Sequence, residues 1–132
     1  MLDTNTVSRL IQNHQAVARR VVAVPMGSLC ISAITEAELL FGLARRPDAK
    51  RLHLVVREFL RRVDSFPWNT DAAERYGPFR AVAAGKGKVL ALLDLLIAAH
   101  ALALGAILVT NDRAFRQIDG LPVEDWSIEP TA

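Results

Sequence analysis

The stretch from Val89 to Asp112, VLALLDLLIAAHALALGAILVTND, is apolar almost throughout, yet Asp94 lies inside it and Asp112 closes it. A carboxylate in apolar surroundings is costly unless it is paired, hydrogen-bonded or bound to a metal. Gly105 interrupts the run, and the GAILVT segment has strand-like composition, so we predict a buried helix over 92–104, a turn and a buried strand. Because about 20 uninterrupted apolar residues are needed to cross a bilayer, we expect no membrane span.

The rest of the chain alternates short strand-like segments with helix-like segments, over 132 residues that fit a single domain. The strand-like segments are 1–3, 28–32, 66–68, 106–110 and 121–127. The helix-like segments are 4–14, 15–24, 34–46, 48–65, 70–85 and 92–104. Thr35 is the expected N-cap of the third helix. This alternation predicts an α/β fold with a largely parallel sheet, whose strands read as continuous apolar runs because helices cover both faces.

Acidic residues follow the strand-like segments or begin the helices after them. Asp3 and Asp112 come directly after two strands, and Asp94 lies in the first turn of the buried helix. Glu36 and Glu38 both lie near the start of the helix after 28–32, and since they are two residues apart they point to different faces. The residues alone therefore leave open which glutamate faces a site beyond the carboxyl ends of the strands.

A cluster of carboxylates at one sheet edge predicts a particular chemistry. Mg²⁺ takes oxygen ligands and keeps several waters, so a few carboxylates and a substrate phosphate suffice to hold it. A metal held in this way activates water and offsets charge on phosphoryl oxygens, which suits phosphodiester hydrolysis. Each acid alone is more simply a helix cap or a dipole partner, so the hypothesis rests on their coincidence.

Other features exclude several classes of protein. The single cysteine, Cys30, excludes a disulfide framework and a four-cysteine zinc site. The chain has neither a G-x-S-x-G elbow nor a Walker loop, so a serine hydrolase and a P-loop nucleotidase have no support. Its start is unlike a signal peptide, so we expect a cytoplasmic protein. The charge of +2 permits a nucleic-acid partner without arguing for one. His100 is expected to be buried and hydrogen-bonded, since it does not share a helix face with Asp94.

Four segments in order, MLDTN, ISAITEAELLFGL, LDLLIAAHALALGAILVTND and GLPVEDW, resemble the PIN-domain ribonuclease toxins of the VapC type. The resemblance covers essentially the whole chain and implies a single PIN domain over 1–132. It implies a three-layer α/β/α fold with a short, mainly parallel central sheet. It further implies an acid cluster that binds Mg²⁺ or Mn²⁺ and cleaves RNA, with a tRNA as the expected target.

The resemblance also assigns the site residues. Asp3, Glu38, Asp94 and Asp112 match the metal-binding and catalytic acids of the family, and Glu36 falls where the family varies, so it is expected to face solvent. Groups expected to orient the acids are Thr4, Asn5, Thr110 and Asn111. Candidate cations for substrate phosphate are Lys86, Lys88, Arg113 and Arg116, although each is also an ordinary surface charge. Leu90 and Ala91 depart from the family pattern, which often has Ile-Gly before the third acid.

The expected partners follow from the same resemblance. VapC toxins pair with a small VapB-like antitoxin that blocks the site, form homodimers and larger toxin–antitoxin assemblies, and meet operator DNA only through the antitoxin. Two apolar helix faces could serve such contacts, but core packing is the favoured role of their residues: Val7, Leu10, Val17 and Val21.

Two alternatives stay open on the sequence. One is a catalytically weak PIN-fold binding module that acts with its antitoxin in operon repression. The other is a metal-dependent DNA nuclease or phosphatase that uses the same acids, since no motif that reads bases or 2′-hydroxyl groups is recognisable.

Overall fold

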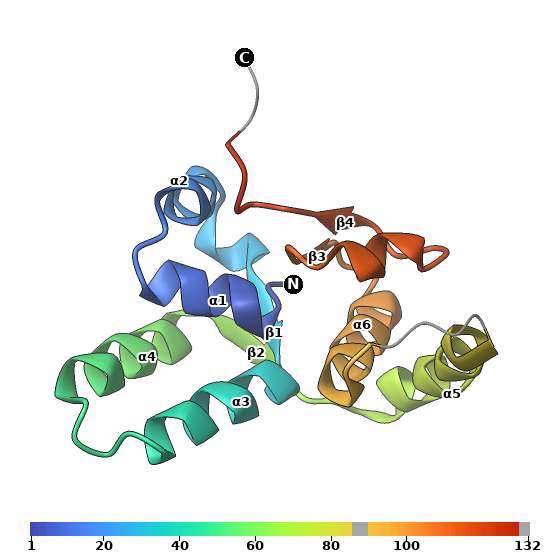
Figure 1. The fold of residues 1–132 in the computed structure, drawn as a ribbon, viewed down its shortest axis with the longest axis horizontal. Coiled ribbons are helices and arrows are strands. Elements are labelled where there is room, and N and C mark those ends of the chain that lie inside the picture. The colour runs from blue at the N-terminus through green and yellow to red at the C-terminus, as the bar shows by residue number, and fades with distance from the viewer. Residues whose placement is uncertain (86–89, 130–132) are drawn as a thin grey trace.

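A computed structural model of the chain describes residues 1–85 and 90–129 (Figure 1). Its α-helices are α1 (Thr4–Ile11), α2 (Gln15–Ala23), α3 (Ala33–Ala44), α4 (Lys50–Arg62), α5 (Thr70–Gly85) and α6 (Leu92–Leu104). Two short 3₁₀ helices are η1 (Met26–Ser28) and η2 (Arg113–Gln117). The strands are β1 (Cys30–Ser32), β2 (Asp64–Phe66), β3 (Leu108–Val109) and β4 (Val123–Glu124). The alternation of helices and strands predicted from the sequence is thus confirmed.

The strands pair in parallel, as expected for an α/β fold. β1 pairs with β2, and β3 pairs with β4. The N-terminal segment lies between the two pairs, since the Leu2 amide donates to the Cys30 carbonyl at 2.9 Å while Leu2 forms a parallel bridge with Val109. The order across the molecule is therefore β4, β3, the N-terminal segment, β1 and β2, and the predicted short parallel sheet is confirmed.

Successive strand residues belong to opposite faces, which creates a core on each side of the sheet. Ile31 and Val109 pack into the first core, whereas Leu108 packs into the second, with the partly buried Cys30 against it. The first core is completed by residues of α1 to α4, including Val7, Val17, Leu39 and Val56. The second core is completed by residues of α6 and η2, including Ile97, Ala98, Ala101 and Phe115. Figure 1 shows α1–α4 on one side of the strands and α5 and α6 on the other, the three-layer arrangement expected.

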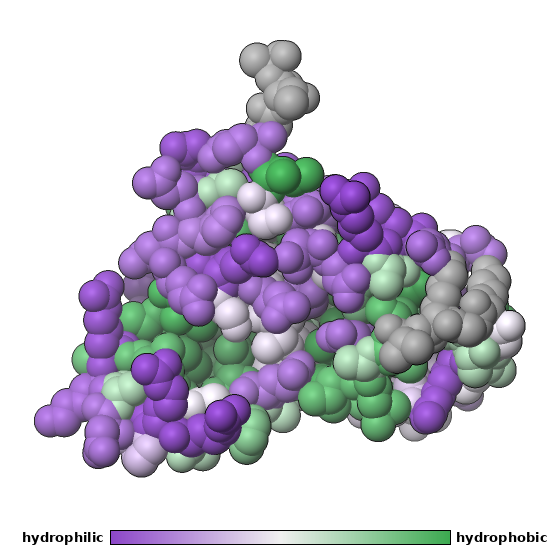
Figure 2. All heavy atoms as spheres, in the orientation of Figure 1, coloured by the Kyte–Doolittle hydropathy of each residue, from purple (hydrophilic) through white to green (hydrophobic). Residues whose placement is uncertain are grey.

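The N-terminal helix faces belong to this first core. Val7 and Val17 are fully buried, Val21 is buried and Leu10 packs against them, so their predicted role in core packing is confirmed. Figure 2 shows polar side chains over most of the face in view, with apolar patches beside them. Among residues 1–85 and 90–129, no helix combines the length and apolarity required to cross a membrane.

The apolar run 92–104 is a buried helix, α6, as predicted. It ends at Gly105, whose φ of 64° is left-handed, a conformation that glycine adopts without the steric penalty of a Cβ. Ala91, at the position where the resemblance suggests glycine, has φ −60° and ψ 146°, so an L-residue is accommodated there without strain. Leu90 packs against the second core.

Two local predictions were wrong. Thr35 is not the cap of α3, because Ser32 takes that position and its Oγ accepts a hydrogen bond from the Ile34 amide at 3.1 Å. The strand expected at 66–68 instead spans Asp64–Phe66. Pro67 has no backbone N–H to donate to a ladder, which explains why the strand ends before it.

Candidate active site

Asp3 and Asp112 follow two adjacent strands and each caps the helix that comes next. The Oδ1 atom of Asp3 accepts from the Thr6 amide at 2.8 Å, and Oδ1 of Asp112 accepts from the Ala114 amide at 2.9 Å. The Asp3 amide donates to the Val109 carbonyl, so the two strand ends are held side by side. In both carboxylates the second oxygen has no hydrogen-bond partner among the residues described, which leaves it free to accept a ligand.

Glu38 is held by a threonine from the neighbouring helix. The Thr4 hydroxyl lies 2.6 Å from Glu38 Oε1 and 3.2 Å from the hydroxyl of Thr35, which is fully buried. A carboxylate can only accept, so the single Thr4 proton goes to Glu38 and Thr35 donates to Thr4. Because Thr4 directly follows Asp3, this chain of hydroxyl groups fixes Glu38 next to the first acid.

Glu36 points away from this group. Its Oε1 accepts a hydrogen bond from the Ser65 hydroxyl of β2 at 2.7 Å, and the side chain is only partly exposed. The prediction that the two glutamates face different directions is therefore confirmed, but the expectation that Glu36 simply faces solvent was wrong. Its contact with β2 comes from tertiary packing that the local sequence does not encode.

Asp94 lies in the first turn of α6, half-buried, with no hydrogen bond or ion pair to any described residue. Its pKa is raised to about 6, first by burial and then by the negative charges of Asp3, Glu38 and Asp112. Asp3, Glu38 and Asp112 therefore lie close enough to Asp94 for their charges to act on it. The structure thus brings together the four acids that the sequence suggested.

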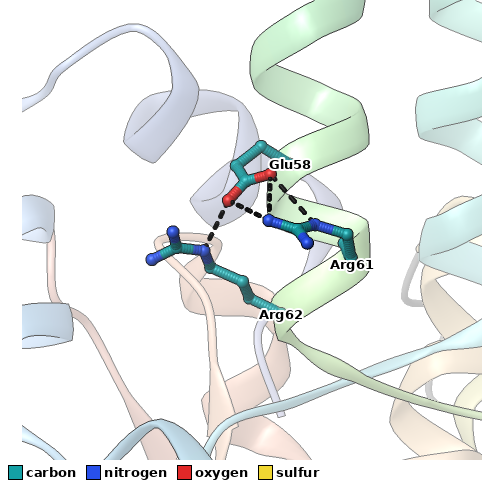
Figure 3. Close-up of polar contacts among 3 residues, drawn as sticks. All are labelled: Glu58, Arg61 and Arg62. Carbon is teal, nitrogen blue, oxygen red and sulfur yellow. Dashed lines mark hydrogen bonds and ion pairs between the residues drawn. The ribbon is translucent and has the colours of Figure 1, made fainter.

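Glu58 on α4 differs from Asp94, because it is paired with two arginines. Its carboxylate accepts hydrogen bonds from Arg61 and Arg62, at 2.6 Å for the Arg62 Nε (Figure 3), and the Arg61 bond, followed by that from Arg62, lowers its pKa. Asp94 has no cation within reach among the residues described, and its neighbours are acids. The acid group therefore carries concentrated negative charge that a bound cation would offset.

The donor chemistry of this group suits a hard divalent cation, which takes carboxylate oxygens. In the described parts of the chain, no three of its acidic, histidine or cysteine side chains already lie in a metal-ligating arrangement. The four acids therefore lie near enough for their charges to act on Asp94, without forming a closed ligand set in the described residues. The residues present fit such an ion, because Asp3, Glu38 and Asp112 are held by hydrogen bonds and the carboxylate of Asp94 has no partner among the described residues.

The residues expected to orient the acids differ in their contacts. Thr4 binds Glu38, and the buried Thr110 accepts from the Asp112 amide at 3.1 Å. Asn5 is exposed and Asn111 partly exposed, and neither side chain bonds to an acid among the residues described. Sequence reasoning missed Thr35 as an orienting group, although its position three residues before Glu38 puts both on one helix face.

The cations proposed for substrate phosphate lie partly outside the described structure. Lys86 and Lys88 fall in 86–89 and so lie outside the described residues. Arg113 and Arg116 are exposed on η2, the helix that Asp112 caps, and neither forms an ion pair with a described residue. These two arginines are therefore free to meet an anion that approaches the acid group from this side.

Comparisons with known proteins identify the family. Residues 1–121 match the PIN domain family. The chain is 37% identical to the tRNA(fMet)-specific endonuclease VapC of Shigella flexneri, over 96% of this chain and 97% of that protein. The chain belongs to the VapC family of PIN-domain ribonucleases. It is accordingly a nuclease, a hydrolase of phosphodiester bonds, as its sequence predicted.

Solved structures of VapC proteins share this fold. The DNA-bound VapBC of Salmonella typhimurium matches with a TM-score of 0.86 at 37% identity, over 96% of each chain. VapBC2 of Rickettsia felis, bound to a promoter DNA fragment, matches with a TM-score of 0.86 at 30% identity, over 96% of this chain and 97% of that one. PIN-domain nucleases generally depend on divalent metal ions, which agrees with the carboxylate chemistry of this site.

The raised pKa of Asp94 predicts that this VapC-family protein loses affinity for divalent cations as the pH falls. Above a pH of about 6 the Asp94 carboxylate is ionised and ready to bind, whereas below it a proton competes with the cation. Affinity should then drop by roughly tenfold for each further pH unit. Calorimetric titration with Mn²⁺ at three pH values across this range measures the effect. An affinity that stays constant down to a full unit below the Asp94 pKa contradicts it.

Proposed function

We propose that this VapC-family protein is the toxin of a toxin–antitoxin pair and that it hydrolyses tRNA with Mg²⁺ or Mn²⁺ held by Asp3, Glu38, Asp94 and Asp112. The observation that carries the proposal is the placement of the four carboxylates: Asp3 and Asp112 follow adjacent strands, Glu38 is bound to Thr4, and Asp94 lies within range of the charges of all three. A cluster of acids that form no ion pair with a described residue, and that each keep a free oxygen, is suited to binding a cation.

In this proposal the protein residues hold and orient the reacting groups. Asp3 and Asp112 stay in place because each also caps a helix, and Thr4 orients Glu38. The bound ion supplies an activated water and offsets charge on the phosphoryl oxygens. Asp94, which has no other partner among the described residues, would supply a further carboxylate to the ion. Arg113 and Arg116 attract the RNA backbone toward an otherwise acidic site.

The substrate proposal rests on the similarity to the Shigella flexneri protein, which is named for its specificity for tRNA(fMet). We propose tRNA as the substrate class of this chain. Since tRNA works in the cytoplasm, we expect the protein to act there. Cleavage of tRNA inhibits translation, which is the toxic effect expected of such a nuclease.

The partner proposal rests on the solved VapBC complexes, two of which contain DNA. We propose that a VapB-like antitoxin binds this chain, that operator DNA is met only through the antitoxin, and that the toxin forms a homodimer. A cavity of about 260 Å³ between α1, α3 and α4 is lined by Glu38, by apolar side chains such as Leu39, Leu52 and Val56, and by polar ones such as Gln12 and Arg46. An apolar segment of the antitoxin that enters this cavity would end beside the acid group and block it.

Metal removal provides the direct test of this function. Purified protein should cleave tRNA in a total RNA sample with Mg²⁺ or Mn²⁺, and EDTA should reduce cleavage to background, because the acids alone neither activate water nor neutralise the phosphate. Gel electrophoresis of the RNA, with duplex and single-stranded DNA as parallel substrates, measures both points. Cleavage that persists in EDTA would overturn the mechanism, and cleavage of DNA alone would overturn the substrate class. A folded protein that cleaves neither would favour the catalytically weak binding module.

A further inference from the structure

The four acids are contributed by both sides of the molecule. Asp3 caps α1 and Glu38 lies on α3, and residues of both helices pack into the first core. Asp94 lies on α6 and Asp112 caps η2, and residues of these two helices pack into the second core. Figure 1 shows α3 and α6 converging near the middle of the molecule, where the strands end. The separation of Glu38 from Asp94 therefore depends on how α3 is held against α6.

One buried side-chain hydrogen bond joins these two helices. His100 Nδ1 on α6 lies 2.7 Å from the Oγ of Ser32, the N-cap of α3, and the two residues are 1% and 0% exposed. The same Ser32 Oγ accepts from the Ile34 amide, so the hydroxyl group is tied to both helices at once. Within residues 1–85 and 90–129, no other hydrogen bond connects α3 or its cap with α6.

This contact lies at the same sequence distance from an acid on each helix. Glu38 comes six residues after Ser32, and Asp94 comes six residues before His100. Six helical residues correspond to about 9 Å along a helix axis. Because a helix is stiff over this length, a displacement at the Ser32–His100 contact changes the separation of the two carboxylates.

The chemistry of the pair favours a permanent contact. Burial lowers the pKa of His100, so the ring is neutral and carries one donor and one acceptor nitrogen. Ser32 can supply the complementary group to either tautomer. A buried polar pair of this kind specifies one arrangement of the elements that carry it, because sliding the helices would leave both groups without partners.

We propose that His100 is a positioning residue that, through Ser32, sets the separation of Asp94 and Glu38 at which the acid group binds a divalent cation. The inference rests on the proposed function, in which these acids hold the ion. It assigns to His100 a role beyond the core packing expected for a buried histidine. A packing role alone predicts lower stability, whereas a positioning role predicts weaker cation binding by protein that remains folded.

Four variants separate these roles. His100→Leu removes the hydrogen bond, and His100→Asn retains a polar atom close to the position of Nδ1. Ser32→Gly removes the hydroxyl group from the other side and leaves a residue that is tolerated at an N-cap. Val17→Ala is the matched control, because Val17 is fully buried in the first core on α2 and has no part in the link. Mn²⁺ affinity by calorimetry and melting temperature by circular dichroism are measured for each full-length protein.

We expect His100→Leu and Ser32→Gly each to weaken Mn²⁺ binding by roughly 10- to 100-fold, as is typical when a group that orients metal ligands is lost. His100→Asn should recover most of this loss. Val17→Ala should lower the melting temperature and leave the affinity of the folded protein unchanged. The double variant Ser32→Gly/His100→Leu should bind no more weakly than the weaker single variant, because both changes remove the same contact.

Several results would contradict the positioning role of His100. If folded His100→Leu and Ser32→Gly bind Mn²⁺ as wild type does, His100 only packs and the inference is wrong, while the proposed function stands. If affinity falls in all variants in proportion to melting temperature, Val17→Ala included, the inference is also wrong. If wild-type protein binds no divalent cation, the proposed function fails and the inference falls with it. Should His100→Leu not fold, Ser32→Gly decides by the same criteria.

Discussion

Replacing Asp94 by Asn is expected to reduce tRNA cleavage by roughly 100-fold or more, because Asn keeps the shape of the side chain but removes an anionic metal ligand. The same change should make the metal-free protein more stable at neutral pH. The folded-state pKa of Asp94 is about 6, above its ordinary value of 3.8. The stabilising contribution of a group with a raised pKa is present below 3.8 and is lost as the pH rises through about 6.

At pH 7.5 the ionised Asp94 therefore opposes folding of the metal-free protein, and Asn removes that opposition. We expect a melting temperature higher by roughly 2–5 °C in EDTA at pH 7.5, and no gain at pH 3.5. Asp71→Asn is the control, since Asp71 is an exposed acid in the first turn of α5. It should leave cleavage unchanged and give no such gain. An Asp94→Asn protein that cleaves like wild type, or that melts lower at pH 7.5, would contradict the role assigned to Asp94.

The second large effect separates two glutamates on one helix. Glu38→Gln should reduce cleavage by roughly 100-fold, because the neutral amide still accepts from Thr4 but binds a cation much more weakly than a carboxylate does. Glu36→Gln should leave cleavage close to wild type, because Glu36 binds Ser65 on the other side of α3. Initial rates on tRNA at saturating Mg²⁺, for proteins with matching circular dichroism spectra, provide the measurement.

This pair is informative because the two changes are chemically identical and only two residues apart. Any general effect of lower net charge or of a weaker α3 falls on both variants. If Glu36→Gln loses as much activity as Glu38→Gln, the assignment of Glu38 to the acid group has no support from this comparison. If Glu38→Gln remains fully active, Glu38 is not a metal ligand.

Much of this arrangement could be predicted from short stretches of sequence, because the physics there is local. The apolar run before Gly105 predicts α6, and acids at the ends of strands predict a common sheet edge. The position of Asp94 within an apolar helix was the feature that most strongly indicated chemistry, and its raised pKa reflects the cost of that position.

Contacts between distant segments could not be predicted in the same way. His100 was expected to be buried and hydrogen-bonded, which is confirmed, but its partner Ser32 lies 68 residues away and no local pattern identifies it. Thr35 resembles a helix cap in sequence, yet Ser32 caps α3 and the Thr35 hydroxyl turns toward Thr4. Capping preferences restrict the choice to a few residues, and only the tertiary structure decides which of them faces the neighbouring helix.

Leu90 and Ala91 stand where the family often has Ile-Gly before the third acid, and the structure explains how this difference is accommodated. Ala91 adopts an ordinary extended conformation at the N-cap of α6, and Leu90 adds apolar surface to the second core. The turn thus delivers Asp94 to the first helical turn without a glycine. The pattern changes, but the position of the third acid is retained.

The most direct test of the central claim is a crystal structure of the full-length protein with Mn²⁺, with the ion located by its anomalous scattering. We predict an anomalous peak at the carboxyl ends of the strands, about 2.1 Å from a carboxylate oxygen of Asp94 and from at least one of Asp3 and Glu38. Asp94→Asn crystals prepared in the same way should show a weaker peak or none. An ion bound elsewhere with the acid group left empty, or a peak of equal strength in Asp94→Asn, would contradict the claim that these acids form the metal site.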